Sequence, residues 1–403
     1  MIEFPHIKTQ RLAVKLKSTA EKLVKQGHPW VFEDSIAKQN KPGNTGDIAI
    51  LFDQRKDKVF AIGLYDVASP IRIKVIHATP ATLDSAFFEG KIQIAFSKRA
   101  SLLKTDTDSY RLIFGENDGF PGLIVDVYHD VLVVKFYTGI WFPYLAMILP
   151  ELVRISNAQT VVVRLSRNLQ KSTKHGFKDG QVIHGELTSE VVYFKEHGIR
   201  FSANVIHGHK TGYFLDHRHN RKRVGELSKN KKILDVFSYA GGFSVHALAG
   251  GASEVLSLDI SAQALEVALQ NGKLNPSKGK HTILAIDAFV GLQQFIDDHK
   301  KFDIVVIDPP SFAKSAREIE SAKHSYHRLA TLGAQLVAKK GILVLASCSS
   351  RVTEQQFFDI SEQGIVKAQR KFKLIDKTFH DSDHPIGFPE GAYLKCGYYR
   401  LDS

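Results

Sequence analysis

The chain has 403 residues, of which 43% are hydrophobic, so it is long and apolar enough to bury more than one core. Its 54 Lys and Arg residues against 42 Asp and Glu give a formal net charge of +12, which favours a polyanionic partner over an acidic small substrate. The two cysteines form neither a disulfide framework nor a zinc-ligand spacing, so we expect no metal site and a reducing compartment.

Segments that would direct the chain into a membrane are not expected. The most apolar segment, residues 140–153, is too short for a bilayer span and is broken by Pro143 and Pro150. Residues 1–5 do not show the basic stretch and apolar stretch of a secretory leader. We therefore expect a cytoplasmic protein with no membrane partner.

Residues 1–77 predict a small β-barrel. Short segments that alternate or are apolar throughout are separated by turn residues, at 11–16, 46–52, 59–65 and 71–76. A turn at Gly27 and Pro29 leads to Trp30 and Phe32. Aromatic side chains beside basic residues can stack on RNA bases, but we expect these two to fill the barrel core.

Residues 78–190 predict an α+β domain. A helical segment at 83–103 is followed by strand-like segments at 122–128, 131–137 and 160–165. The turn residues at 115–122 are expected to open a hairpin. This domain carries no catalytic pattern, and we expect it to act as a spacer with RNA contacts.

Residues 191–403 predict an α/β domain with a mostly parallel, Rossmann-like sheet. Apolar runs of strand length alternate with segments long enough for crossover helices. The runs lie at 232–237, 254–259, 282–287, 302–308 and 341–347. The carboxyl ends of parallel strands line one crevice, and polar or thiol residues stand there: Asp235, Asp259, Asp287, Asp308 and Cys348. This layout indicates an S-adenosylmethionine-dependent methyltransferase.

The first of these strand ends predicts a cofactor loop. The segment is not a clean G-x-G-x-x-G, so a dinucleotide site is weakly indicated, but its glycines allow close approach of the backbone to a ligand at a helix N-terminus. The expected cofactor contacts in this loop are Asp235, Phe237, Ser238, Gly241 and Gly242.

The next two strand ends are expected to hold the nucleoside part of the same ligand. Asp259, with Ile260, is placed to bind ribose hydroxyls, and Asp287, with Ala288, to meet an adenine edge. One such Asp could be an ordinary cap where a strand ends. Three in register favour a nucleoside site.

The fourth and fifth strand ends carry the predicted chemistry. Asp308 is followed by Pro309 and Pro310, which stiffen the chain, and by Phe312, so a carboxylate and an aromatic ring could hold a planar base. The Cys348 thiolate could attack carbon 6 of a pyrimidine, since carbon 5 of cytosine is too weak a nucleophile to take a methyl group unaided. The alternative is a buried core cysteine, as we expect for Cys396.

A basic stretch precedes this sheet. Residues 205–232 contain eight Lys or Arg against two acidic residues. Lys210 and Arg221 are expected to contact RNA phosphates, and Arg218 either phosphates or the carboxylate of the cofactor. Part of the stretch could be only a solvated helix face.

Several motifs together resemble one family. They are His28-Pro-Trp-Val-Phe, Gly115-Glu-Asn-Asp-Gly-Phe-Pro-Gly, Lys210-Thr-Gly-Tyr-Phe-Leu-Asp-His-Arg, Asp308-Pro-Pro-Ser-Phe, Ser347-Cys-Ser, Asp383-His-Pro and Pro389-Glu-Gly-Ala-Tyr-Leu-Lys. The chain resembles the bacterial 23S ribosomal RNA cytosine-5 methyltransferases of the large-subunit methyltransferase I type, with a PUA domain, a central domain and a class I methyltransferase domain. The resemblance implies S-adenosyl-L-methionine as cofactor, 23S rRNA as partner, and Phe214, Asp216 and Arg218 as residues that enclose the cofactor. It also implies Cys348 as nucleophile and Asp308 as the anchor of the base.

Two residues depart from the family pattern, and alternatives stay open. His217 stands where Gln is common, and Ser350 where Gly often follows Ser-Cys-Ser. The chain could instead methylate a purine nitrogen in rRNA, a reaction that would not need Cys348, or be a catalytically silent RNA-binding assembly factor. The sequence also leaves open a homodimer.

Overall fold

The computed structural model describes residues 7–171, 175–313 and 315–402 and divides the chain into two compact units. Unit 1 comprises Met1–Lys195, Ala203–Leu215 and Ser382–Gly391, and unit 2 comprises Glu196–Ser202, Asp216–Asp381 and Ala392–Ser403. The chain first passes between them in the paired strands β12 (Val191–Glu196) and β13 (Ile199–Asn204). The division into three domains at 77 and 190 stays a prediction. Residues 1–5, on which the expectation about a secretory leader rests, lie outside the described residues.

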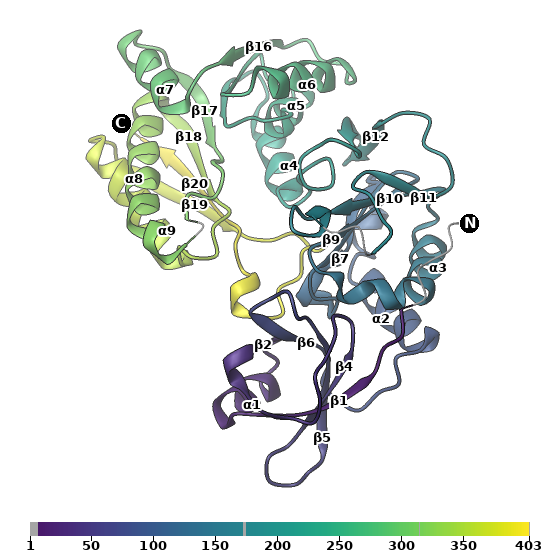
Figure 1. The fold of residues 1–403 in the computed structure, drawn as a ribbon. Coiled ribbons are helices and arrows are strands. Elements are labelled where there is room, and N and C mark those ends of the chain that lie inside the picture. The colour runs from purple at the N-terminus through teal and green to yellow at the C-terminus, as the bar shows by residue number, and fades with distance from the viewer. Residues whose placement is uncertain (1–6, 172–174, 314, 403) are drawn as a thin grey trace. The chain divides into compact units, whose positions relative to one another are not determined.

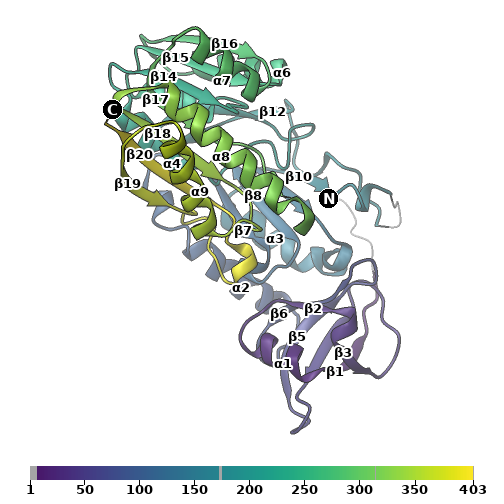
Figure 2. The same ribbon diagram turned by 90° about the vertical axis from the view of Figure 1, so that its left-hand side faces the viewer.

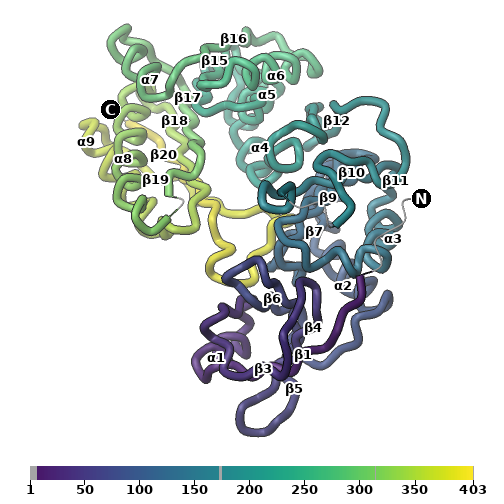
Figure 3. Tube along the Cα trace, in the orientation of Figure 1, coloured from purple at the N-terminus to yellow at the C-terminus, as the bar shows by residue number. Residues whose placement is uncertain are grey.

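Unit 1 begins with a six-stranded mixed sheet in the order β2-β6-β5-β4-β1-β3. Figure 3 traces this first part of the chain in purple. The inward side chains of its first strand alternate as a half-buried strand requires, because Leu12, Val14 and Leu16 are all at most 1% exposed. The predicted strands 11–16 and 59–65 coincide with β1 and β5. The elements are β1 (Arg11–Leu16), α1 (Ser18–Lys25), β2 (Trp30–Phe32), β3 (Ile36–Gln39), β4 (Ile48–Phe52), β5 (Val59–Tyr65) and β6 (Ile71–His77).

The expected core positions of Trp30 and Phe32 are wrong. Val31, between them, points into the core, so the period of two along β2 turns both aromatic rings away from it. Phe32 is 43% exposed. Trp30 is half-buried, donates its indole N–H to Glu116 Oε1 at 3.1 Å and packs edge-on against the Phe388 ring at 5.1 Å between centroids. Trp30 therefore fastens the first sheet to later parts of unit 1.

The second sheet of unit 1 has the order β11-β10-β9-β8-β7. The predicted hairpin is present: β7 and β8 pair antiparallel on either side of residues 115–122, where all three glycines have positive φ. All six residues of β9 and of β10 are buried, so these strands form the centre of the core. The elements are α2 (Ser85–Ser97), β7 (Ser109–Phe114), β8 (Leu123–Tyr128), β9 (Val131–Phe136), α3 (Leu145–Ser156), β10 (Thr160–Leu165) and β11 (Gln181–His184).

Unit 2 is built on a seven-stranded sheet in the order β16-β15-β14-β17-β18-β20-β19 (Figure 1). The first five strands in this order run parallel, β20 pairs antiparallel with β18, and β19 pairs antiparallel with β20. This confirms the mostly parallel α/β sheet expected from the apolar runs. The strands are β14 (Lys232–Val236), β15 (Glu254–Asp259), β16 (Lys280–Ala285), β17 (Phe302–Ile307), β18 (Val337–Ser347), β19 (Phe372–Thr378) and β20 (Lys395–Leu401).

Helices cover both faces of this sheet. Neighbouring residues of a central strand point to opposite faces, and on each face the apolar side chains pack against helices. In β17, Val305 packs with side chains of α7, α8 and α9, whereas Ile304 packs with those of α4 and α5. Figure 2 shows the long helix α8 lying against the strands. The helices are α4 (Arg218–Leu227), α5 (Gly242–Ala249), α6 (Ala262–Lys273), α7 (Ala288–Asp297), α8 (Ile319–Leu336) and α9 (Glu354–Lys367). Among the helices of the described ranges, none has the length and apolar character needed to cross a bilayer.

Candidate active site

The strand order of unit 2 reverses at β14. From β14 the chain proceeds to β15 and β16 on one side, then crosses to β17 and β18 on the other. In open α/β sheets, ligands bind at the carboxyl ends of the strands beside such a switch point. The structure brings the predicted residues to this edge: Asp235 one residue before the end of β14, Asp259 at the end of β15, Asp287 at the start of α7, Asp308 after β17 and Cys348 after β18.

Asp235 has a buried carboxylate with one unused oxygen. Its Oδ2 accepts hydrogen bonds from the Ser244 N–H at 3.0 Å and from the Ser244 hydroxyl at 2.6 Å. Its Oδ1 is buried and has no hydrogen-bond partner among the described residues. Burial raises the pKa of Asp235 to about 7, although the Ser244 bonds lower it. Such an oxygen is suited to a cationic or hydrogen-bonding ligand.

The loop between β14 and α5 has an unusual backbone. Phe237 and Tyr239 adopt left-handed conformations with φ of 63° and 47°, which cost energy for residues with a side chain. Gly241, at φ 77°, permits contact with α6, because an added Cβ would lie 2.7 Å from Cβ of Ala268. The buried Ser238 hydroxyl has no partner among the described residues. The loop therefore presents a second unused polar atom beside Asp235, and Gly242 begins α5 directly after it.

The carboxylates at the next two strand ends, Asp259 and Asp287, accept hydrogen bonds from backbone N–H groups. Asp259 accepts hydrogen bonds from Tyr239 at 3.0 Å and from Ser261 at 2.9 Å, and Ile260 beside it is 75% exposed. Asp287 caps α7 by accepting from Phe289 at 2.9 Å and from Val290 at 3.2 Å. Ala288 is buried at the first position of that helix. The bonds of Asp287 are those of a helix cap, so its contact with adenine stays a prediction.

The Cys348 thiol lies against the loop that follows β17. Strands β17 and β18 are neighbours, and Cys348 Sγ donates to the Pro309 carbonyl at 3.7 Å. Beside it, the Ser347 hydroxyl donates to the Tyr326 hydroxyl at 2.9 Å, and the Tyr326 ring meets Phe312 edge-on at 5.2 Å. Asp308 is partly exposed, with 24% of its side chain accessible, and so is Pro310. The carboxylate, the thiol and an aromatic ring thus belong to one packed cluster.

The thiol is not activated in the free protein. Burial, followed by the charges of Asp308 and Asp216, raises the pKa of Cys348 to about 12. The charge of Lys395 lowers the pKa of Cys348 and so acts against this shift, while burial lowers the pKa of Lys395 itself to about 8. Lys395 donates to the carbonyls of Ser349 and Val352, the latter at 2.8 Å, and so fixes the segment after the thiol. A cation bound nearby would favour the thiolate.

The residues around the start of α4 are held by a hydrogen bond and by buried ion pairs. Asp216 accepts from the Tyr393 hydroxyl at 2.8 Å, and Arg218 Nη1 lies 3.3 Å from Asp381 Oδ2. Arg221 is 3% exposed and donates from two nitrogens to Glu196, at 2.7 and 2.6 Å. We therefore correct the expected RNA contact of Arg221 to a structural role, because the guanidinium is buried against a carboxylate.

Two predicted site residues, Lys210 and Phe214, belong to unit 1. Lys210 is exposed, and Phe214 is 40% exposed. Their contacts with RNA and cofactor stay predictions. The Asp383-His384 motif also belongs to unit 1, where Asp383 accepts from the Arg111 N–H at 2.9 Å, so its role is structural.

The sequence analysis did not predict three residues that hold site groups in place, namely Glu196, Lys395 and Tyr326. Each of them does so through a hydrogen bond to a residue distant in the sequence. A charged residue at a strand end was the only available signal for Glu196 and Lys395.

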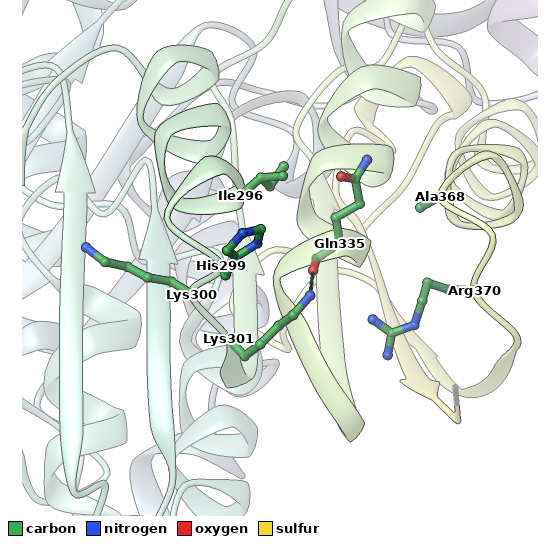
Figure 4. Close-up of a pocket in the computed structure, with 7 residues that line it drawn as sticks. All are labelled: Ile296, His299, Lys300, Lys301, Gln335, Ala368 and Arg370. Atoms are coloured by element: carbon green, nitrogen blue, oxygen red, sulfur yellow. Dashed lines mark hydrogen bonds between the residues drawn. The ribbon is translucent and has the colours of Figure 1, made fainter.

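A cavity of about 220 Å³ lies at the other end of β17 (Figure 4). Its lining is basic, but the cations are engaged: Lys301 donates to the Gln335 carbonyl at 2.5 Å, and Arg370 to those of Ala334 and Val337 at 2.8 Å each. Because Lys301 precedes β17 whereas Asp308 follows it, this cavity is separate from the cluster around Cys348.

Comparison with known proteins identifies the family. Residues 120–363 match the model of an S-adenosylmethionine-dependent methyltransferase, and residues 14–78 match that of a PUA-like domain. A ribosomal RNA large subunit methyltransferase of Deinococcus radiodurans is 42% identical over 99% of both chains. The chain belongs to the ribosomal RNA large subunit methyltransferases. A large subunit methyltransferase I of Escherichia coli is 35% identical over 93% of this chain and 96% of its own.

Solved structures agree with the fold of this methyltransferase. A protein described as a SAM-dependent methyltransferase from Streptococcus mutans superimposes with a TM-score of 0.81, at 22% identity, over 96% of this chain and 99% of its own. A second, described as a methyltransferase complexed with SAH, has a TM-score of 0.81 at 23% identity, over 97% and 100%. The unused buried oxygens of Asp235 and Ser238 fit the cofactor of this family, S-adenosylmethionine, which carries a sulfonium and an ammonium group.

The titration of Asp235 predicts how cofactor affinity depends on pH. Its folded-state pKa of about 7 lies above the usual value, so the carboxylate becomes charged as pH rises through 7. If a cationic ligand lowers that pKa by one unit, affinity gains about fivefold between pH 6 and 8, out of a full change of about tenfold. Calorimetric titration with S-adenosylmethionine should show this gain in affinity for the wild type and no gain for Asp235→Asn. Because the ligand is the same in both titrations, the variant also controls for the ligand's own protonation. Equal slopes for both proteins would contradict the contact.

Proposed function

We propose that this methyltransferase forms 5-methylcytosine in 23S rRNA through a covalent adduct on Cys348, with Asp308 as the anchor of the base. The observation that supports the proposal is the contact of the Cys348 thiol with the Pro309 carbonyl, directly after Asp308. The strand order also supports it, because Cys348 and Asp308 follow the adjacent strands β18 and β17, and β17 pairs with β14, the strand of the buried Asp235. The named relatives in turn suggest the large-subunit RNA as substrate.

The residues present suit addition to a pyrimidine. When bound, S-adenosylmethionine supplies an electrophilic methyl group on sulfur. Sγ of Cys348 would bond to carbon 6 of the base as the thiol proton passes to Asp308 and from it to N3, and carbon 5 would become an enamine carbon. Carbon 5 would then take the methyl group. Loss of the proton on carbon 5, cleavage of the bond from carbon 6 to sulfur and return of the N3 proton to sulfur would restore the ring and the thiol, so one methyl group enters and one proton leaves.

Asp308 would face the N3 edge of that base. Its carboxylate is partly exposed and follows β17 immediately, and Pro309 and Pro310 restrict the chain after it. A fixed hydrogen-bonding group at N3 stabilises the charge that develops on the ring during addition. The target base would have to leave its stack to reach this edge of the sheet.

Nucleoside analysis tests the product. Unmodified 23S rRNA is incubated with labelled S-adenosylmethionine and the enzyme, digested, and separated into nucleosides. We expect the label in 5-methylcytidine at one site. Label in a methylated guanosine or adenosine would favour the alternative, nitrogen methylation of a purine, since a nitrogen lone pair needs no cysteine. No label in RNA, beside normal cofactor binding, would favour a silent assembly factor.

The other parts of the chain are assigned roles in RNA binding and in linking the domains. We propose that residues 1–77 act as a PUA-like RNA-binding domain, that residues 78–190 link it to the methyltransferase domain at 191–403, and that the enzyme works in the cytoplasm. The PUA-like match at residues 14–78 supports the first of these. Sedimentation would decide between a monomer and a homodimer.

A further inference from the structure

Four side chains of unit 2 form a continuous hydrogen-bond chain that begins at Asp235. Its Oδ2 accepts from the Ser244 hydroxyl at 2.6 Å, and Ser244 Oγ lies 2.6 Å from Ser257 Oγ. Ser257 Oγ in turn lies 2.8 Å from Nε2 of His281. Strands β14, β15 and β16, which carry Asp235, Ser257 and His281, are neighbours in the sheet. The hydrogen-bond chain therefore crosses three strands, from the buried carboxylate to the last strand of the sheet.

The hydroxyl protons set the direction of the hydrogen-bond chain. Each serine hydroxyl has one proton to donate. Ser244 donates its proton to Asp235, so it must accept from Ser257. Ser257 has then used its own proton and must accept from Nε2 of His281. Both serines are fully buried, so bulk water cannot replace either donor. An ionised Asp235 therefore requires His281 to carry its proton on Nε2.

The surroundings of the imidazole favour the same tautomer. Nδ1 is buried, has no hydrogen-bond partner within the described ranges, and faces α6, where a Cβ added at Gly272 would lie 3.0 Å from it. A proton on Nδ1 would be a buried donor without an acceptor, which costs free energy. Burial lowers the pKa of His281 to about 4, so the ring is neutral at pH 7 and has one ring proton to place. That proton belongs on Nε2, where Ser257 accepts it.

We propose that His281 is a positioning residue for Asp235: its Nε2–H, acting through the two serines, keeps both hydroxyl groups directed toward the carboxylate, whose unused Oδ1 binds the cofactor. Without a donor at the far end, the Ser257 hydroxyl could turn away from Ser244, and the Ser244 hydroxyl from Asp235. The carboxylate would then lose a hydrogen bond that favours its charged form. The inference goes beyond the proposed function, since it requires only that Asp235 contacts the cofactor and holds whichever nucleoside receives the methyl group.

Affinity for S-adenosylmethionine, measured by calorimetry, tests the role of the donor. His281→Leu removes Nε2–H, whereas His281→Gln can place an amide N–H near the same point. We expect His281→Leu to bind the cofactor about fivefold more weakly than wild type, the effect of one hydrogen bond, and His281→Gln to recover most of that loss. Wild-type affinity of His281→Leu, or equal weakening by both variants, would overturn the proposal. Thr282→Val is the matched control, because it removes the hydroxyl of the next residue along β16, outside the hydrogen-bond chain, and should leave affinity unchanged.

A double-mutant cycle tests whether His281 acts through the serines. Ser257→Ala interrupts the hydrogen-bond chain, so His281→Leu should weaken cofactor binding no further in that background. An equal loss from His281→Leu in both backgrounds would show that the histidine acts by another route and would refute the proposal. Thermal unfolding of each variant separates a loss of affinity from a loss of folded protein.

The tautomer of His281 supplies a test that needs neither activity nor a change in affinity. Nitrogen NMR of protein with isotope-labelled histidine distinguishes a protonated from an unprotonated ring nitrogen, and the signals of residue 281 are assigned by their absence from His281→Gln. In the complex with S-adenosylmethionine we expect Nε2 to be protonated and Nδ1 unprotonated. A proton on Nδ1 instead would reverse the hydrogen-bond chain and overturn the proposal. Because this result does not depend on the nucleoside analysis, failure of the cytosine assignment and failure of the role of His281 are distinguishable.

Discussion

Replacing Cys348 with alanine is expected to abolish methyl transfer to RNA and to leave S-adenosylmethionine binding unchanged. Carbon 5 of a cytosine takes a methyl group only after a nucleophile has added at carbon 6, so loss of the sulfur removes the whole route. The loss of single-turnover rate should exceed about 10³-fold, the scale seen when a covalent nucleophile is removed. Cofactor affinity, measured by calorimetry, should stay within about twofold because Asp235 and Ser238 are untouched.

The second cysteine supplies the matched control. Cys396 is buried within β20, opposite Ala346 of β18, and Cys396→Ala should retain transfer at the level its stability allows. RNA that contains 5-fluorocytidine should trap wild type as a covalent adduct, because the proton that must leave carbon 5 is replaced by fluorine. Full activity of Cys348→Ala would refute the covalent route, and so would trapping of that variant.

The thiol of the free enzyme requires activation by its ligands. Because burial and the nearby carboxylates raise the pKa of Cys348 to about 12, the thiol of the free enzyme is protonated at pH 7. The sulfonium of the cofactor is a cation that would oppose the effect of the Asp308 and Asp216 carboxylates on the thiol. Cysteine reactivity is thereby linked to an occupied site, which would protect the free enzyme from oxidation.

Apolar runs that end in a polar residue were sufficient to predict the sheet of unit 2 and the edge where its polar residues meet. The runs at 254–259 and 302–308 coincide with or closely match β15 and β17, because buried parallel strands are apolar on both faces. The positions of Asp308 and Cys348 on adjacent strands followed from strand order and the family resemblance.

Contacts between distant residues could not be predicted in this way. Arg221 looked like one more surface cation in a basic stretch, and only the fold places Glu196 against it. Trp30 looked like a core residue, yet its register in β2 directs it to Glu116, 86 positions along the chain. A periodic pattern predicts which face of a strand is buried. It does not predict which polar group the side chains of the opposite face will contact.

Glu196 is the centre of a buried ionic cluster in unit 2. Its fully buried carboxylate accepts from Arg221 at 2.7 and 2.6 Å and lies 2.8 Å from His246 Nε2, and Arg218 Nε is 3.9 Å away. Burial raises the pKa of Glu196, but Arg221 and His246 outweigh it, and the net pKa is well below the usual value. The carboxylate is therefore charged at neutral pH.

We expect Glu196→Ala to lower the free energy of unfolding by about 3–5 kcal/mol, because it leaves the Arg221 guanidinium buried without its partner. Urea denaturation at pH 7 measures this effect. Glu190→Ala is the matched control: its exposed pair with His207, at 3.5 Å, should contribute at most about 1 kcal/mol. A double variant, Glu196→Leu with Arg221→Met, should recover much of the loss, since an apolar pair leaves no unpaired charge. Equal stability of wild type and Glu196→Ala would show that the cluster contributes nothing to the folding of unit 2.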